Sequence, residues 1–503
     1  MRARCRCRYT PRMRRDAISL FPSIDAMATR PAIRIGDDVL DYAALATTCA
    51  LFRRAMAEIG IGRQDRVAIW AHPDLETIVG LIGSISAGIT TIPLNPGTGD
   101  KELAHILADA KPRAIFSAHP ERDRARTPSV PVHGFTNSGR SLITHRLADD
   151  RNADEPILVL YTSGTTGAPK GAALSANNIA ATLAGLQHAW ALEETDTIVH
   201  ALPLFHAHGL VFGLFGALHV GACLHFVPKF SPEVVAAALE APRTVLYAVP
   251  TMYRRLIDAA ERDPNVERGL RAARLLVSGS AALPAREHVR IERVTGQRVC
   301  ERYGLSETLV NTAVRHDGER RPGYVGLPLL GVDVKIVDDD RVTLAVRDDS
   351  TLGEIAVRGP NVFLGYLNRP DATAAVVDDD GWFYTGDLGT LAPDGYLRIV
   401  GRKATDLIKT GGFKVGAGEV EAALLEHPAV SEVAVVGLPD EDLGERIVAY
   451  VVARAEPPPA AELIEHVASL IAKHKRPREI RFVRELPRNA LGKVLKKQLV
   501  SLV

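Results

Sequence analysis

The stretch YTSGTTGAPKG at residues 161–171 carries groups that can bind a polyphosphate. Gly164 and Gly167 allow the backbone to turn with its N–H groups pointing inward, and Lys170 supplies a cation. Further hydrogen-bond donors are the hydroxyl groups of Thr162, Ser163, Thr165 and Thr166. The spacing differs from the G-x-x-x-x-G-K-[ST] pattern of P-loop proteins, because a glycine follows the lysine. We therefore expect a phosphate-binding loop of another kind, after a strand over 156–161 and before a helix that begins near residue 175.

A second chemical feature is the arginine in CERYGLSET, residues 300–308. Arg302 stands beside a tyrosine, a glycine, two hydroxyl residues and Glu307, a mixture typical of a polar pocket floor. Burying a guanidinium costs free energy unless an anion meets it. That anion is either a carboxylate of the chain, such as Glu301 or Glu307, or part of a ligand.

Composition limits the partners. The 503 residues include 61 Lys and Arg against 60 Asp and Glu, and a net charge of +1 gives no sign of a nucleic-acid partner. Small molecules are the expected partners. The five cysteines lack zinc-binding spacing, which suits a reducing cytoplasm. The Arg-rich residues 1–16 are interpreted as a disordered or non-native extension in preference to an organelle transit peptide.

The most apolar segment, LVFGLFGALHVGACLHFV at 210–227, approaches the length of a membrane span. It contains two histidines and three glycines and lacks flanking anchor residues. We predict a buried helix followed by a buried strand, and no membrane span.

The order of strand-like and helix-like segments predicts the fold class. From about residue 31 onward, apolar runs such as RVAIW at 66–70 alternate with helical patterns, as in an α/β fold with largely parallel sheets. Beyond Leu330 shorter strands predict a β-rich subdomain. The charged segment 401–412 indicates a joint, after which a compact α/β pattern follows. We therefore predict a large N-terminal domain of sheets flanked by helices, with that subdomain, over 17–401, and a small C-terminal α/β domain over 402–503.

Five motifs, in order and spacing, resemble those of the adenylate-forming acyl-CoA synthetases. They are YTSGTTGAPKG, ERYGLSET at 301–308, YTGDLG at 384–389, GRKATDLIKTGG at 401–412 and PRNALGK at 487–493. The resemblance implies that an acid attacks the α-phosphorus of ATP and expels pyrophosphate, and that the thiol of CoA then displaces AMP. ATP and CoA would be co-substrates and Mg²⁺ the cofactor. The C-terminal domain would move between the two half-reactions about a hinge at 402–406.

The resemblance also implies roles for the motif residues. Glu307, with a loop hydroxyl such as that of Ser163, would hold Mg²⁺, and Lys493 would be a mobile lysine that contacts the attacking carboxylate and the α-phosphate. Lys170, Glu307 and Lys493 form the expected catalytic set. Gly411 and Gly412 would border the path of the CoA thiol. The expected ATP-binding residues are Thr162, Ser163, Gly164, Thr165, Thr166, Gly167, Lys170, Ser280, Ala281, Ala282, Tyr303, Asp387, Arg402 and Lys493.

A second arginine is evidence for the identity of the acid substrate. Arg255 lies in a segment that borders the acyl pocket in this family, and two guanidiniums on one pocket favour a carboxylate between them. LPLFHAHGL at 202–210, GSAALP at 279–284 and ERRPGYVGLPL at 319–329 further resemble the malonyl-CoA synthetases. This resemblance implies malonate, with methylmalonate as a second candidate, and places Arg255 and Arg302 on its distal carboxylate. The remaining substrate-binding residues would be His206, Ser278 and Gly279.

Other functions stay open at this point. A medium-chain or aromatic acyl-CoA ligase would prefer acids with uncharged tails. An enzyme that loads a carrier protein, which is not favoured, would share every motif up to the thiol step. A nucleotide-binding protein without catalysis would not need Lys493, Glu307 and Asp387 together. His206 and His208 have the spacing of one strand face, but no third metal ligand follows, so we expect them in a pocket wall.

Overall fold

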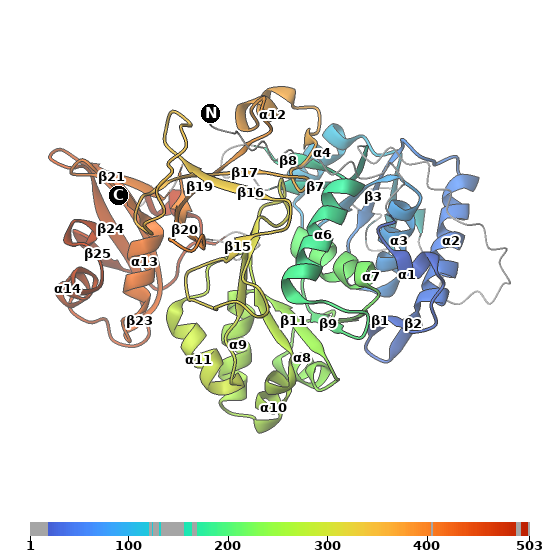
Figure 1. Cartoon of the computed structure of the whole chain (residues 1–503), viewed down its shortest axis with the longest axis horizontal. Coiled ribbons are helices and arrows are strands. Elements are labelled where there is room, and N and C mark those ends of the chain that lie inside the picture. The colour runs from blue at the N-terminus through green and yellow to red at the C-terminus, as the bar shows by residue number, and fades with distance from the viewer. Residues whose placement is uncertain are drawn as a thin grey trace, which may run out of the picture.

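The computed structural model of the chain describes residues 19–119, 123, 130–131, 155–162, 168–403, 406–488 and 494–500. Two large sheets and a smaller one occupy the chain up to Arg402, and a separate sheet lies beyond Leu407 (Figure 1). The architecture is the predicted α/β class, with a large sheet-rich N-terminal part and a smaller C-terminal part.

The first large sheet is formed mainly from the N-terminal third of the chain. β3, β4, β5 and β7 run parallel, while β8 is antiparallel to β7. In sheet order the strands are β18 (Gly365–Tyr366), β8 (Lys170–Ser175), β7 (Pro156–Thr162), β4 (Thr90–Leu94), β3 (Arg66–Trp70), β5 (Ala114–Ser117) and β6 (Val130–Pro131). The helices of this region are α1 (Pro22–Asp25), α2 (Tyr42–Glu58), α3 (Leu75–Ser86) and α4 (Asp100–Ala110). The hairpin of β7 and β8 means that the phosphate loop joins two antiparallel strands, and that α6 (Ala176–Trp190) follows only after β8.

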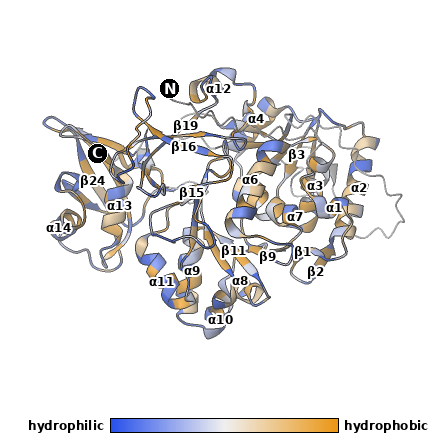
Figure 2. Cartoon of the chain, in the orientation of Figure 1, coloured by the Kyte–Doolittle hydropathy of each residue, from blue (hydrophilic) through white to orange (hydrophobic). Residues whose placement is uncertain are grey.

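The second large sheet has a parallel centre, β1-β10-β9-β11-β12-β13. Its inner strands β9, β11, β12 and β13 are buried on both faces, as the continuous apolar runs of the first three require. In sheet order they are β15 (Leu327–Pro328), β14 (Thr312–Ala313), β13 (Cys300–Tyr303), β12 (Leu275–Ser278), β11 (Thr244–Ala248), β9 (Thr197–His200), β10 (Cys223–Phe226), β1 (Pro31–Ile35) and β2 (Asp38–Asp41). The helices are η1 (His208–Phe215), α7 (Gly216–Val220), α8 (Pro232–Leu239), α9 (Pro250–Ala260), α10 (Pro264–Ala272) and α11 (Ala285–Thr295). Outer helices such as α11 carry both apolar and polar residues, and thus have one face for the core (Figure 2).

The apolar segment 210–227 is a helix followed by a strand, as predicted, and the helix is buried, whereas β10 buries Leu224 and Phe226 and leaves Cys223 and His225 half-buried. Its first part differs from an ordinary helix, because His208–Phe215 form a π-helix before α7 begins. π-Helical turns are rare and are found mostly at functional sites. Among the described residues, no helix is long and apolar enough to span a membrane.

The predicted change of architecture beyond Leu330 is present. A smaller antiparallel sheet contains β16 (Asp333–Val337), β17 (Gly353–Arg358), β19 (Phe383–Leu391) and β20 (Leu397–Arg402), with α12 (Pro370–Val376) nearby. The C-terminal sheet contains β22 (Phe413–Gly416), β21 (Leu407–Thr410), β24 (Gly444–Ala453), β23 (Val430–Asp440) and β25 (Glu479–Phe482). Its helices are α13 (Ala417–Leu425), α14 (Ala460–Leu470), the 3₁₀ turn η2 (Lys473–Lys475) and α15 (Lys496–Val500). The change of sheet thus falls between Arg402 and Leu407, the segment expected to contain the hinge.

Candidate active site

The expected site residues gather at the carboxyl ends of the parallel strands of the second sheet. Ser278 ends β12 and Tyr303 ends β13, and His200, which was not among the expected residues, ends β9. These three strands belong to the same parallel centre. In open α/β sheets ligands bind outside the carboxyl ends of the strands. The sheet therefore brings together residues that lie up to about a hundred positions apart in the sequence.

One side of this region is a polar network around Asp387 of β19. The Tyr303 hydroxyl donates to Asp387 Oδ2 over 2.5 Å, and Arg402 Nε lies 2.7 Å from Asp387 Oδ1. The carboxylate is buried, with 5% of Asp387 exposed, and its two oxygens are both used. Burial, together with the Asp387 charge, holds the pKa of Tyr303 well above its ordinary value, so this phenol stays a donor. The three residues assigned to the nucleotide thus form one satisfied group, and their contacts with ATP stay predictions.

A second group connects the phosphate loop with the expected metal ligand. Lys170, at the start of β8, places its Nζ 4.1 Å from the centre of the Tyr366 ring, and the Tyr366 hydroxyl donates to Glu307 Oε1 over 2.8 Å. Sequence reasoning missed Tyr366, which lies outside the motifs. Its ring fixes the distance between the loop cation and the carboxylate.

Glu307 has the chemistry that Mg²⁺ requires. Its carboxylate is nearly buried, and the Tyr366 bond to Oε1 leaves an oxygen to meet a cation. Mg²⁺ in phosphate-transfer sites is bound by one or two carboxylates together with phosphate oxygens. In the described part of the chain, no group of three or more His, Cys, Asp or Glu residues is placed to hold a metal ion. Ser163, the second expected ligand, and Gly164, Thr165, Thr166 and Gly167 lie outside the described residues.

The other side of the region surrounds Arg302. This side chain is buried, with 6% of the residue exposed, and its Nε and Nη2 atoms have no hydrogen-bond partner within the described structure. Its guanidinium carbon lies 4.7 Å from the centre of the Phe212 ring. Burial lowers the pKa of Arg302 to about 10, so the group remains charged at neutral pH. A buried charge supported mainly by an aromatic face lacks an anion.

The two carboxylates that could have neutralised Arg302 are used elsewhere. Glu301 accepts from the backbone N–H of Leu283 and pairs with His288 at 2.9 Å. Glu307 bonds to Tyr366. Neither carboxylate, among the residues that the structure describes, pairs with Arg302.

Further unpaired polar atoms lie in the same region. In the described structure, the Nε2 atoms of three histidines and two hydroxyls are buried without a hydrogen-bond partner, and they belong to His200, His206, His208, Tyr247 and Ser278. Burial lowers the pKa of His206 to about 4 and of His200 to about 3, so both are neutral at pH 7. The His208 ring lies 6.1 Å from that of Phe212 and 6.2 Å from that of Tyr247. Orphan polar atoms of this density indicate a site for a polar ligand or ordered water.

The expectation that His206 and His208 share a strand face is wrong. His206 lies in a bend after β9, and His208 opens the π-helix. His208 Nδ1 lies 3.2 Å from the hydroxyl of Ser280. His200, Phe212 and Tyr247 are site residues that sequence reasoning did not assign, whereas the sequence predicts a pocket wall for His208.

The segment 278–282 passes directly over Arg302. A Cβ atom at Gly279 would lie 2.4 Å from Arg302 Nε, so a larger residue there would displace the Arg302 side chain. Ser280 has φ +72°, a left-handed conformation that is rare outside glycine and common at functional sites. Ala281 and Ala282 are exposed beside it and remain open to a ligand.

The structure does not bring Arg255 into contact with Arg302. Arg255 is exposed on α9, and its guanidinium carbon lies 4.9 Å from the centre of the Phe230 ring. Its expected contact with the acid stays a prediction.

The expected residues of the C-terminal domain lie apart from this region. Gly411 and Gly412, with φ of +57° and +81°, form the exposed turn between β21 and β22. Lys493 lies outside the described residues. The roles of these three residues stay predictions.

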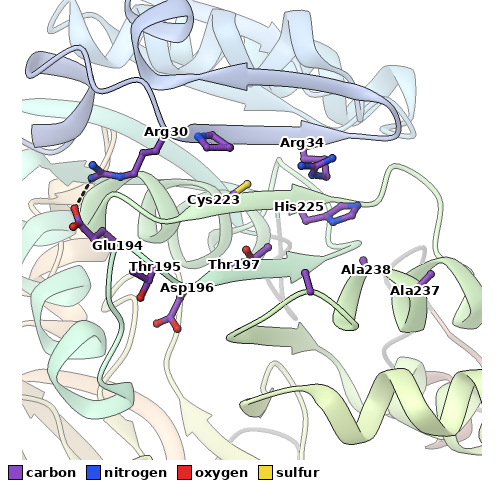
Figure 3. Close-up of a pocket in the computed structure, with 12 residues that line it drawn as sticks. Arg30, Arg34, Glu194, Thr195, Asp196, Thr197, Cys223, His225, Ala237 and Ala238 are labelled. Atoms are coloured by element: carbon purple, nitrogen blue, oxygen red, sulfur yellow. Dashed lines mark ion pairs between the residues drawn. The ribbon is translucent and has the colours of Figure 1, made fainter.

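A separate pocket of about 420 Å³, lined by Arg30, Arg34, Thr197, Cys223 and His225 among others, is not this site (Figure 3). Thr197 and Cys223 are the first residues of β9 and β10, so the pocket lies at the amino ends of the parallel strands. Arg30 is already paired with Glu194 there at 3.0 Å.

Comparison with known proteins agrees with this arrangement. The family model described as AMP-binding enzyme matches residues 23–367, and that of the AMP-binding enzyme C-terminal domain matches residues 419–493. The chain belongs to the AMP-binding enzyme family. It is an AMP-forming acid–thiol ligase, an adenylate-forming acyl-CoA synthetase that resembles the malonyl-CoA synthetases.

Similar sequences include the human malonate–CoA ligase ACSF3, mitochondrial, at 36% identity over 87% of this chain and 83% of the relative. The malonate–CoA ligase of Arabidopsis thaliana is 35% identical over 86% of the chain and 77% of the relative. A sulfoacetate–CoA ligase of Cupriavidus necator is 34% identical over 92% of both chains.

Two solved structures bear on the arrangement of the ligase's domains. A malonyl-CoA ligase with methylmalonyl-CoA and AMP bound is 48% identical, covers 92% of this chain and 98% of its own, and has a TM-score of 0.69. The ATP-bound MatB of Rhodopseudomonas palustris is only 33% identical, covers 96% and 99%, and has a TM-score of 0.85. The higher score at lower identity indicates that the ligase shares more of its overall arrangement with the ATP-bound structure.

Proposed function

We propose that the ligase converts malonate, ATP and CoA into malonyl-CoA, AMP and pyrophosphate. One malonate carboxylate attacks the α-phosphorus of ATP, and the bond to pyrophosphate breaks. The CoA thiolate then attacks the carbonyl carbon of the malonyl adenylate, and AMP leaves with the bonding electron pair. The distal carboxylate takes no part in bond changes and serves only in recognition.

The observation that carries this proposal is the unpaired guanidinium of Arg302. A buried charge with two orphan N–H atoms is costly, and a carboxylate that accepts from both would offset this cost. An acid with a neutral tail would leave the charge unpaired and desolvated. The neutral histidines around it can donate one N–H each to the same carboxylate without adding charge.

On the nucleotide side, the residues assigned to ATP would divide the work of binding it. Lys170 and the loop before β8 would meet the β- and γ-phosphates, and Asp387 with Arg402 would meet the ribose. Glu307 would hold Mg²⁺, which when bound neutralises charge on the departing pyrophosphate. Lys493 would add positive charge at the α-phosphate during attack.

The decisive experiment is ATP- and Mg²⁺-dependent AMP formation in the presence of CoA, with malonate, methylmalonate, acetate and octanoate compared by kcat/KM. Malonate at least about 100-fold ahead of acetate is expected, because an unpaired buried charge costs several kcal/mol. Acetate or octanoate ahead of malonate would overturn the proposal and leave the ligase class intact. Replacing CoA by a holo carrier protein tests the acceptor, and CoA is expected to be far better.

Sulfoacetate belongs in the same panel. A relative carries that substrate in its name, and a sulfonate also offers oxygen acceptors to Arg302. The neutral His200 and His206 can each donate an N–H to either anion, so the discrimination comes from shape. A flat carboxylate matches the planar guanidinium at two points, and malonate is expected to be preferred.

We also propose a cytoplasmic location. Cys49 and Cys300 are buried free thiols and Cys223 is a partly buried one, as suits a reducing compartment. A fluorescent fusion at the C-terminus in the native host, compared with one lacking residues 1–16, tests whether the Arg-rich start directs the protein elsewhere.

A further inference from the structure

Helix α13 of the C-terminal domain contacts the N-terminal domain at both of its ends. At its start the two backbones nearly touch. A Cβ at Gly416 would lie 2.0 Å from Val400 Cγ1, and one at Gly418 would lie 2.4 Å from the Val400 carbonyl oxygen. Val400 belongs to β20, directly before the joint, so this contact is tied to the hinge itself.

The other end of α13 is held by one side chain. Arg286, the second residue of α11, donates from Nη1 to the carbonyl oxygens of Leu425 at 2.9 Å and Val430 at 2.7 Å. Its Nη2 donates to the carbonyl of Ser431 at 3.0 Å. Figure 1 shows α11 beside the lower ends of α13 and β23, as these bonds require. Leu425 is the last residue of α13, and the other two residues begin β23.

The hydrogen bonds from Arg286 to the end of α13 are expected to be strong. The last carbonyls of a helix lack partners inside the helix and carry the negative end of its dipole, so a guanidinium is a favourable cap. Hydrogen bonds from a charged donor are about twice as strong as neutral ones. The Arg286 side chain is only 19% exposed, so solvent screens the bonds little. By contrast the other charged contact nearby, Arg254 with Glu432, spans 3.9 Å with Arg254 43% exposed, and such pairs add little.

We propose that Arg286 is a positioning residue: by capping α13 across the domain boundary it holds the C-terminal domain in the adenylate-forming arrangement. The mobile lysine assigned to that step, Lys493, belongs to the domain that Arg286 holds. Removing the cap would lower the fraction of molecules in which that domain is in place for the first half-reaction. Arg286 itself touches none of the residues assigned to ATP or the acid. The inference rests on the ligase class and not on malonate, and it goes beyond the proposed substrate.

The test separates the two half-reactions in the full-length ligase. The rate of acyl-adenylate formation is followed by pyrophosphate release in a single turnover without CoA, using the acid that the wild type prefers. The rate of thioester formation is followed after adding CoA to the preformed adenylate. We expect Arg286→Ala and Arg286→Met to slow adenylate formation by about tenfold, the equivalent of one hydrogen bond to a charged group. Thioester formation and the KM for ATP should stay within about twofold, and Arg286→Lys should restore part of the rate.

Arg290→Ala is the matched control. Arg290 lies one turn further along α11, and its guanidinium bonds to Asp258, Glu261 and Glu287, all within the N-terminal domain. The Arg290→Ala substitution removes the same charge from the same helix without removing any contact to α13. The rates of both half-reactions in this variant should match those of the wild type. Small-angle scattering of the apo enzyme gives a second readout, with a wider distribution of domain positions in Arg286→Met alone.

Several outcomes would overturn the inference. They are wild-type adenylate formation in Arg286→Met, an equal loss in both half-reactions, or an equal loss in Arg290→Ala. A wild type that prefers an acid other than malonate would refute the proposed substrate and leave this test unchanged, because the preferred acid is used throughout.

Discussion

Arg302 and Tyr303 are neighbours in β13, yet their surroundings are opposites. The Tyr303 side bonds to Asp387, which also pairs with Arg402, so each charged group there has its partner before any ligand binds. The Arg302 side has orphan N–H atoms, neutral histidines and unpaired hydroxyls. Successive residues of a strand point to opposite faces, which lets one short strand serve both environments. The difference teaches that the Tyr303 side, proposed to bind the nucleotide, is preorganised, whereas the Arg302 side, proposed to bind the acid, would be completed only by its ligand.

The strongest test of this difference is to remove the unpaired charge of Arg302. Arg302→Met should lower kcat/KM for malonate by at least about 100-fold, because the distal carboxylate loses its charged partner. The same change should raise the free energy of unfolding by about 1–3 kcal/mol, since an unpaired buried charge is replaced by an apolar side chain. AMP formation and urea denaturation measure the two effects. Retained malonate activity, or a less stable variant, would contradict the unpaired state of Arg302.

On the Tyr303 side, where the charged groups are paired, a substitution should lower the free energy of unfolding and also weaken the binding of ATP. Asp387→Asn leaves Arg402 without its ion pair and weakens the bond from Tyr303. We expect the free energy of unfolding to fall by about 1.5–3 kcal/mol and the KM for ATP to rise, with the preference for malonate over acetate unchanged. A shift in that preference would mean that the two sides are not separate.

The buried histidines on the Arg302 side should make the stability of the protein depend on pH. Burial depresses the folded pKa of His206 to about 4 and of His200 to about 3, below the ordinary 6.5. Between pH 6.5 and 4 the unfolded chain therefore binds more protons than the native protein, so stability is full above pH 6.5 and is lost as the pH falls. Each such histidine adds a slope of about 1.4 kcal/mol per pH unit. His206→Gln should reduce the measured slope of unfolding free energy in this range, and an unchanged slope would show that His206 is already protonated in the folded state.

The smallest expected effect compares two buried hydroxyls. Tyr42 donates to the Ala222 carbonyl at 2.7 Å, whereas the Tyr247 hydroxyl has no partner in the described structure. Tyr42→Phe should lower the free energy of unfolding by about 0.5–1.5 kcal/mol, while Tyr247→Phe should leave it unchanged or slightly raised. Equal losses in the two variants, measured by chemical denaturation, would mean that Tyr247 is bonded.

Much of the fold was predictable from local patterns. The apolar runs at 66–70 and 156–161 became β3 and β7 because strands buried on both faces need continuous apolar sequence. The π-helix at His208–Phe215 was not predictable, because its apolar, glycine-containing sequence is equally compatible with an ordinary helix. Tyr366 was missed for a similar reason, since a tyrosine after a glycine carries no local sign of the distant carboxylate to which it donates.

The sequence by itself determined the chemistry class, because each of the five motifs is a short local pattern and their order along the chain is that of the family. Only the tertiary structure decided which charges have partners. Glu301 is adjacent to Arg302 in sequence yet pairs with His288, and Glu307 bonds to Tyr366, 59 residues away. Arg286 reaches carbonyls 139 to 145 positions further on. Pairing of charges depends on distance and burial in space, so the unpaired Arg302 and the capped α13 could appear only once the chain was folded.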